Sequence, residues 1–399
     1  MAKWCAGLLL LLCLLAPSGL VSFSEYQDRD SKPVPEDIPA LRMVADPFPA
    51  LNGIAVDPEN HLVVASDPNR KSLLLYDKFP PAGSSTATAP ARQIVGPNTN
   101  LGMVAGVLVD PQHHEILTAN NDIEDTVVVM PYDANGNANP ARVLSVPHQA
   151  WGLALGRKHD ELAVSVEIFN AVVFYRREAH GVEAPVRVIR GPKTGMADPH
   201  GIAWDELHDE IAVASHGNFR GLYRNNGAGC VPVEPDDKES DTVEIGKFRP
   251  PSISVFSTDA KGDTAPLRVI QGPKTQLDWP MGIAVDVARN EIAVANNGDS
   301  SILIFDRKAA GNASPVRVIR GTHTGIDHPM GISVDSVSGD IWVSNFGNHS
   351  ALAFAHRASG DAIPKHVILS APKGTPTPGF GNPMAVAYDC KRGEILVPN

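Results

Sequence analysis

One hydrophobic pattern recurs along most of the chain. Its core is a short run of the type Gly-Ile-Ala-Val-Asp, preceded by a variable residue. Seven copies have this variable residue at positions 52, 105, 151, 200, 281, 330 and 384, so successive copies are 53, 46, 49, 81, 49 and 54 residues apart. A sequence period close to 50 residues indicates a solenoid or a propeller.

Each copy resolves into four short hydrophobic runs. In the copy at Met281 they cover residues 282–285, 291–296, 301–305 and 315–320. Runs that are rich in β-branched residues and bounded by Gly, Asn and Asp predict strands and hairpins. Four strands in each repeat are typical of a β-propeller blade. No segment keeps a 3.6-residue apolar period, so the pattern excludes a helical repeat and predicts an all-β fold.

The seven copies predict a seven-bladed propeller of four-stranded blades over residues 40–399. The last copy offers only two strands, and residues 40–46 match the fourth run of a repeat. A blade built from residues 384–399 and 40–46 would close the ring with strands from both termini and leave no free sheet edge. The alternative is six blades with a partial cap.

The long step of 81 residues contains an insertion at about residues 217–251. It falls between the second and third strands of the fourth repeat. Long loops of this kind often act as lids or binding loops. A tolerated surface insertion is the alternative, because loop closure costs little more as a loop grows.

The first 24 residues have the pattern of a secretory signal peptide. Lys3 is followed by an apolar stretch over residues 4–16 and by small residues near Ser24. This stretch is shorter than the roughly 20 residues of a membrane-spanning helix, and no later segment is long and apolar enough to span a bilayer. We therefore expect a secreted or periplasmic protein, with an N-terminal extension at residues 25–39 before the propeller.

The charge balance narrows the choice of partners. The chain has 45 Asp and Glu against 34 Lys and Arg, a formal net charge of −11. An acidic chain lacks the positive field that attracts nucleic acid or anionic lipid. A small molecule or an exported protein partner is the remaining expectation.

Two charged series recur with the repeat, and we expect both to be structural. The arginine series is Arg92, Arg142, Arg187, Arg268 and Arg317, with His366 in the sixth place, and the glutamate series is Glu115, Glu161, Glu210, Glu291 and Glu394. The first series lies on the fourth strands and the second in the hairpins. A charge that recurs in every blade is typical of a solvated face or of an ion pair between blades.

The repeat resembles a known family. The run Pro-Met-Gly-Ile-Ala-Val-Asp at residues 280–286, with the runs at 290–296 and 301–305, is similar to the NHL repeat and its secreted propeller relatives. The resemblance covers residues 40–399 and implies the propeller fold. Lyases, lactonases, RNA binders and binding scaffolds all use this fold, so the resemblance does not select one activity.

Propeller geometry places the candidate site. The first strand of each blade lines the central channel, and the loops before it share one face with the loops after the second strand. Ligands usually bind on this face, at the channel mouth. The candidate residues there are His148, Trp151, Glu167, His200, His216, Met281, Asn296, Met330, Asn345 and Met384.

Three chemistries are open for these residues, and the cofactor is either none or a single divalent metal. Converging histidines would bind a transition metal, although only His200 stands where the amidating lyases that resemble this chain carry their zinc-binding histidines. Thioethers such as Met281 with one imidazole suit Cu(I), or they fill the mouth as apolar groups. Amide and carboxylate oxygens, as in Asn345 and Glu167, suit calcium, or they stabilise turns.

The leading expectation is a ligand-binding or protein-interaction module with its ligand at the channel mouth. The alternative is a metal-dependent propeller enzyme, either a lactonase or other hydrolase, or a lyase. Convergence of His148, His200, His216 and Glu167 would favour the enzyme, whereas scatter of these groups around the mouth would favour the binding module.

Overall fold

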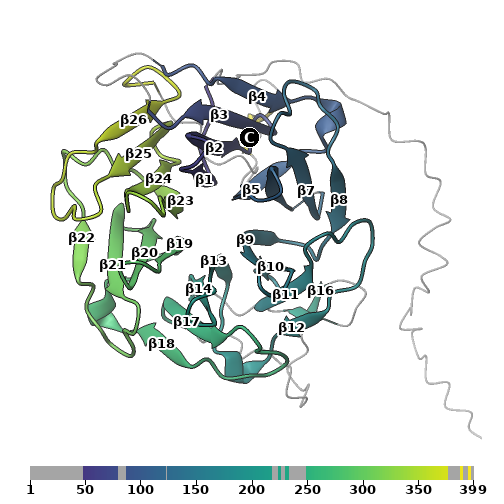
Figure 1. The fold of residues 1–399 in the computed structure, drawn as a ribbon, viewed down its shortest axis with the longest axis vertical. Helices are drawn as coiled ribbons and strands as arrows, with labels where there is room; N and C mark the ends of the chain where they lie inside the picture. Colours follow the sequence, from purple (N-terminus) through teal and green to yellow (C-terminus); the bar gives the residue numbers. More distant parts are fainter. Residues whose placement is uncertain are drawn as a thin grey trace, which may run out of the picture. The chain divides into compact units, whose positions relative to one another are not determined.

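A computed structural model shows a ring of six four-stranded antiparallel sheets (Figure 1). It describes residues 48–79, 87–122, 124–217, 223–225, 230–232, 249–375, 387–389 and 394–396. Each sheet is one blade, and its strands follow one another in sequence from the channel outwards. The predicted all-β propeller of four-stranded blades is confirmed.

The first three blades have short strands joined by tight turns. Blade 1 comprises β1 (Ile54–Asp57), β2 (Leu62–Asp67), β3 (Ser72–Asp77) and β4 (Arg92–Val95). Blade 2 comprises β5 (Met103–Asp110), β6 (Glu115–Asn121), β7 (Thr126–Pro131) and β8 (Arg142–Ser145). Blade 3 comprises β9 (Ala150–Gly156), β10 (Glu161–Val166), β11 (Ala171–Arg176) and β12 (Arg187–Ile189).

The next three blades repeat this plan. Blade 4 comprises β13 (Pro199–Asp205), β14 (Glu210–Ser215), β17 (Ser252–Ser257) and β18 (Arg268–Gln271). Blade 5 comprises β19 (Pro280–Asp286), β20 (Glu291–Asn296), β21 (Ser301–Asp306) and β22 (Arg317–Ile319), and blade 6 comprises β23 (Pro329–Val334), β24 (Ile341–Asn345), β25 (Ser350–Phe354) and β26 (His366–Leu369). The helices in the described residues are the 3-10 turns η1 (Pro97–Thr99), η2 (Pro192–Thr194) and η3 (Pro273–Thr275).

The hydrophobic core lies between neighbouring blades. The β-branched runs are buried on both faces, because each sheet packs against one sheet before it and one after it. In one such layer Ile302 and Ile304 of blade 5 pack with Ile341 and Phe354 of blade 6. This arrangement explains why the runs are almost continuously apolar rather than strictly alternating.

The prediction of seven blades was wrong, and the six-bladed alternative is the one found. Leu74 and Tyr76 of blade 1 share a buried layer with Trp342 and Ala353 of blade 6. The amide of Gly331 donates to the carbonyl of residue 52 (3.1 Å), so the first strands of blades 1 and 6 are neighbours. The period alone did not reveal this, because packing between sheets sets how many blades complete the ring.

The seventh copy forms a separate hairpin. Its strands β27 (Ala387–Asp389) and β28 (Glu394–Leu396) pair with each other and with no other described strand. The proposed closing strand at residues 40–46 lies outside the described residues, as do the predicted signal peptide (1–24) and extension (25–39). Within the described chain, no helix has the length and apolarity needed to cross a membrane.

The predicted insertion lies between β14 and β17. Two of its segments are described, β15 (Tyr223–Asn225) and β16 (Cys230–Pro232), and they pair antiparallel. The other residues between 217 and 249 lie outside the described residues.

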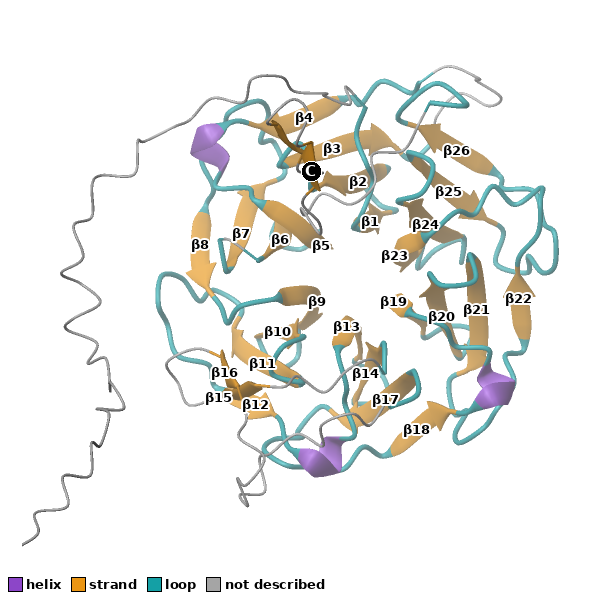
Figure 2. Ribbon diagram, turned by 180° about the vertical axis from the view of Figure 1, so that it is seen from behind, coloured by secondary structure: helices purple, strands orange, loops and turns teal. Residues whose placement is uncertain are grey.

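Glycines let the inner strands approach closely around the channel, which Figure 2 shows from the other face. A Cβ atom on Gly152 would lie 2.4 Å from the carbonyl oxygen of His200, and one on Gly106 would lie 2.1 Å from that of Trp151. Both distances are far too short for a side chain. The glycine in each copy of the repeat is therefore required where one blade meets the next.

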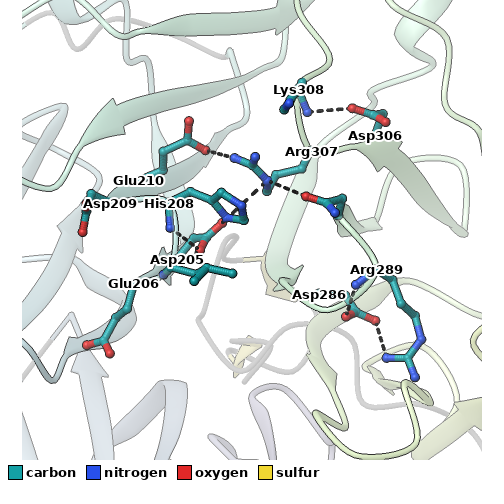
Figure 3. Close-up of polar contacts among 12 residues, drawn as sticks. Asp205, Glu206, His208, Asp209, Glu210, Asp286, Arg289, Asp306, Arg307 and Lys308 are labelled. Atoms are coloured by element: carbon teal, nitrogen blue, oxygen red, sulfur yellow. Dashed lines mark hydrogen bonds and ion pairs between the residues drawn. The ribbon is translucent and has the colours of Figure 1, made fainter.

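The recurring arginines and glutamates form ion pairs at the end of the channel opposite the candidate site. In blades 2, 3, 4 and 5 the arginine of the fourth strand pairs with the glutamate of the second strand; the pairs are Arg142–Glu115, Arg187–Glu161, Arg268–Glu210 and Arg317–Glu291. Their structural role is confirmed, but each pair lies within one blade. A second cation crosses the boundary, as Arg307 of blade 5 does to Glu210 of blade 4 (Figure 3).

Candidate functional site

The candidate site lies at the channel mouth, which we define as the end where the first strands of the blades begin. Blade 4 supplies its centre. Asp198 precedes β13, His200 is the second residue of β13, and His216 follows β14. The amide of His216 donates to the carbonyl of Asp198 (3.0 Å), so the antiparallel pairing of β13 and β14 brings the three residues together.

These three side chains form a compact cluster of potential metal ligands. One donor atom from each lies within 4.8 Å of the other two. The rings of His200 and His216 are stacked, with centroids 3.5 Å apart and planes inclined by 18°. Both histidines are buried. Two imidazoles and a carboxylate are a ligand set suited to zinc and to other first-row transition metals.

The neighbouring blades add one side chain on each side. Oε1 of Glu167, from blade 3, lies 3.5 Å from Nε2 of His200. Sδ of Met281, from blade 5, lies 2.6 Å from Nε2 of His216. The Glu167 carboxylate is held in turn by Asn121, whose Nδ2 donates to Oε1 (3.1 Å). The cluster therefore extends over four consecutive blades.

Two tryptophans flank the histidine stack. The ring of Trp151 lies 4.5 Å from that of His200, and the ring of Trp279 lies 5.3 Å from that of His216 and nearly parallel to it. Trp279 is 48% exposed and has a backbone φ of 48°. A bulky residue rarely adopts positive φ, and such strained positions are concentrated at functional sites.

Burial and neighbouring charges shift the pKa values of the cluster. Burial, with the nearby His216, lowers the pKa of His200 to about 3, so this imidazole is neutral at physiological pH. Burial and the charge of Asp198 raise the pKa of Glu167 well above its usual value. For Asp198, burial raises the pKa, but the contacts with His216 and His200 outweigh it and the net pKa is lowered.

The channel continues below this site as a cavity of about 300 Å³. The first strands of all six blades line it, mostly with glycine, alanine and β-branched residues. Trp151 lies among the lining residues near the mouth, and Arg157 and Trp204 lie among those toward the opposite end. A small ligand at the mouth would thus meet polar groups above a narrow channel with a largely uncharged wall.

The structure brings together five of the predicted site residues: Trp151, Glu167, His200, His216 and Met281. His148 stays apart, half-exposed and paired with Asp125 (2.9 Å). The sulfur of Met330 accepts a hydrogen bond from Nδ2 of Asn297 (3.3 Å). Met384 lies outside the described residues.

Asn296 and Asn345 have structural hydrogen bonds instead of a place in the cluster. Oδ1 of Asn296 accepts from the amide of Asp278 (2.7 Å), and Nδ2 donates to the carbonyl of Gln276 (3.0 Å). Asn345 repeats this pattern with Asp327 and Gly325. Both amides are completely buried and fasten the loop before the first strand to the second strand.

Asp198 and Trp279 were missed by the sequence analysis. Both stand two residues before the variable position of the repeat, and both have positive φ. Their common signal is a proline at the next position, Pro199 and Pro280. Proline disfavours the right-handed helical region for the residue before it, so these positions could have been recognised as turns that aim a side chain at the mouth.

Comparisons with known proteins add no family. The sequence matches no protein-family model, and no protein of curated function is significantly similar to it. What the structure establishes is a six-bladed propeller of four-stranded antiparallel blades. The resemblance to NHL repeats stays a prediction from the residues.

Proposed function

We propose that this protein binds a transition-metal ion at the channel mouth and, through it, a small-molecule ligand. The observation that carries the proposal is the convergence of Asp198, His200 and His216, with one donor atom from each within 4.8 Å of the others. A neutral, buried imidazole such as His200 is available to a metal without loss of a proton.

The surroundings support a ligand-binding role for such an ion. Trp279 exposes an aromatic face beside the cluster, and the channel offers space below it. Exposed aromatic rings with a few convergent polar groups are typical of small-molecule sites. A secreted or periplasmic location, and kinship with the secreted NHL-type propellers, are parts of the same proposal and come from residues 1–24 and from the repeat pattern.

A metal-dependent hydrolase or lyase is the second candidate, and Glu167 favours it. Its carboxyl lies 3.5 Å from Nε2 of His200, and burial raises its pKa well above the usual value. A carboxyl group with a raised pKa beside a metal is suited to general acid–base catalysis. In this function the metal would polarise a substrate oxygen or activate water, and Glu167 would accept or deliver the proton.

The test is metal binding by the purified protein. After removal of metals with a chelator, calorimetric titration with Zn²⁺ should give one equivalent for the wild type. His200→Ala and His216→Ala should abolish this binding, and His148→Ala should leave it unchanged as the matched control. Absence of binding by the wild type, or equal loss in the control, would contradict the proposal.

The two candidate functions are separated by Glu167→Gln. If the protein is a binding module, this variant keeps both the metal and the bound ligand. If the protein is an enzyme, the variant keeps the metal but loses turnover of ester, lactone or peptidyl substrates by about 100-fold or more, the scale expected for a lost general acid or base.

A further inference from the structure

The stacked histidines present two different sides to the protein. On the Nδ1 side lies Asp198, with its carboxylate oxygens 3.8 Å from His200 and 3.5 Å from His216. On the Nε2 side lie Glu167 and Met281. A single ion in contact with both rings must therefore choose between a side with one hard carboxylate and a side that also has a soft sulfur.

Hydrogen bonds assign the protons of the two rings. Nδ1 of His200 is 3.1 Å from the backbone carbonyl of Asp198, and because a carbonyl only accepts, this nitrogen is the donor. Nδ1 of His216 faces the Asp198 carboxylate, which as an anion also only accepts. Both Nδ1 atoms therefore carry protons, and both Nε2 atoms keep their lone pairs for a ligand.

Met281 is the side chain that this assignment does not otherwise explain. It is 3% exposed, and its Sδ approaches the Nε2 lone pair of His216 to 2.6 Å. A methionine that only fills space packs its sulfur near the edge of a ring and has no need to meet a nitrogen lone pair. Two lone pairs that face each other at this distance repel, unless a cation binds to both.

We propose that the metal centre is a copper site whose ligands are Nε2 of His200, Nε2 of His216 and Sδ of Met281. This inference rests on the proposed metal binding and specifies the metal. Thioether and imidazole donors together select copper, above all Cu(I), over zinc. Glu167 lies beside the same side of the stack as an oxygen donor for Cu(II).

Asp198 has a positioning role in this arrangement. Its carboxylate and its backbone carbonyl hold the Nδ1 atoms, as outer-shell carboxylates and carbonyls commonly do for metal-bound histidines. It fixes the tautomer of each ring and turns both Nε2 atoms toward Met281. Asp198 is therefore assigned as a residue that orients the ligands and not as a ligand itself.

The experiment compares Cu(I) and Zn²⁺ on the same metal-free protein. Cu(I) affinity is measured without oxygen by competition with a chromogenic chelator, and Zn²⁺ affinity by calorimetry. Met281→Leu keeps the size and apolarity of the side chain but removes the sulfur. Met330→Leu is the matched control, because that residue holds the same repeat position in blade 6 and its sulfur accepts a hydrogen bond from Asn297.

We expect Met281→Leu to lower Cu(I) affinity by about 100-fold, since even outer-shell changes cost 10–100-fold. Zn²⁺ affinity should change by less than about threefold, because zinc prefers the nitrogen and oxygen donors that remain. X-ray absorption at the copper edge should show a sulfur neighbour in the wild type and in Met330→Leu, but not in Met281→Leu. Asp198→Asn should keep that sulfur neighbour and weaken both metals.

Other results would overturn the inference. Zn²⁺ binding without Cu(I) binding, or copper with no sulfur neighbour in the wild type, would refute the copper site and leave the proposed metal binding intact. Loss of the sulfur neighbour in Asp198→Asn would make Asp198 more than a positioning residue. Failure to bind either metal would refute both proposals.

Discussion

Arg307 of blade 5 donates a hydrogen bond from Nη1 to Oε2 of Glu210 in blade 4, across a distance of 2.7 Å. Arg268 binds the same carboxylate from within blade 4. Burial raises the pKa of Glu210, but the two guanidinium groups outweigh it, and the net pKa is lowered. The pair therefore stabilises the fold at neutral pH, and this contribution is lost as the pH falls below about 4.5 through the lowered pKa.

Arg307→Met is expected to lower the free energy of unfolding by about 2 kcal/mol. Breaking a fully buried pair costs about 3–5 kcal/mol, and here Arg268 still compensates part of the charge of Glu210. Urea unfolding at pH 7 measures the effect. Lys308→Ala, which changes the exposed neighbour, should cost less than about 0.5 kcal/mol; an equal loss in both variants would contradict this role for the boundary pair.

Asp67 takes the place of a structural asparagine. It pairs with Ser72 as Asn296 pairs with Ser301, in the same register at the end of the second strand. Its Oδ1 accepts from the amide of Arg70 (3.2 Å), but its buried Oδ2 has no hydrogen-bond partner. Burial raises the pKa of Asp67 to about 6, against smaller lowering effects of nearby amides.

The raised pKa of Asp67 sets the direction of its pH effect. The folded protein keeps the proton up to about pH 6, whereas the unfolded chain loses it near pH 3.8. Stability is therefore lost as the pH rises between these values. The penalty above pH 6 is about 3 kcal/mol from the size of this shift.

Asp67→Asn should remove this penalty. We expect it to stabilise the protein by up to about 3 kcal/mol at pH 7.5 and by about half as much at pH 5. The measurement is the difference in unfolding free energy between variant and wild type at the two pH values. Glu59→Gln, at an exposed carboxylate, should show no such pH trend, and a pH-independent gain for Asp67→Asn would refute the assignment.

Gly152→Ala should disturb the metal centre through the backbone. The added Cβ would lie 2.4 Å from the carbonyl oxygen of His200 and 3.0 Å from the amide of residue 202. Blades 3 and 4 would have to separate, at a cost of about 1–3 kcal/mol. Metal affinity should fall by about tenfold, as for other disturbances of ligand orientation.

Gly331→Ala is the control for this backbone effect. Its Cβ would clash with the backbone of blade 1 at 2.8 Å, but far along the ring from the histidine stack. It should destabilise the fold and leave metal affinity unchanged. If both glycine variants lose metal equally, the loss comes from stability rather than from the position of His200.

A chain that ends at Thr375 should still fold as a propeller. Blade 6 joins blade 1 through the first strands, and the amide of Thr88 donates to the carbonyl of Leu369 (2.6 Å) at the rim. Scanning calorimetry should show one cooperative transition with a melting temperature close to that of the full chain. A broad or multistep transition would mean that the residues after 375 complete the ring.

The blade was predictable from sequence because its constraints are local. Period-50 copies, β-branched runs and turn residues all act within one repeat, and they agreed with one another. The number of blades was not predictable, since it depends on how Tyr76 and Trp342 pack between sheets that are far apart in sequence.

The site was partly predictable for the same reason. The repeat placed His200 and Met281 on one ring of positions, and the hairpin geometry added Glu167 and His216. The alignment could not show that Asn296 spends its amide on the backbone. It also could not show that Asp198 turns inward, because that depends on a left-handed backbone conformation before Pro199.

At the channel mouth, the residue after the second strand of one blade contacts the variable residue at the start of the next. Glu167 meets His200, His216 meets Met281, and Asn297 meets Met330. Each boundary thus works as a two-residue socket on an unchanged backbone. Exchanging one such couple for another would give the scaffold a new chemistry without redesigning a single sheet, and this protein already displays acid–imidazole, imidazole–thioether and amide–thioether versions side by side.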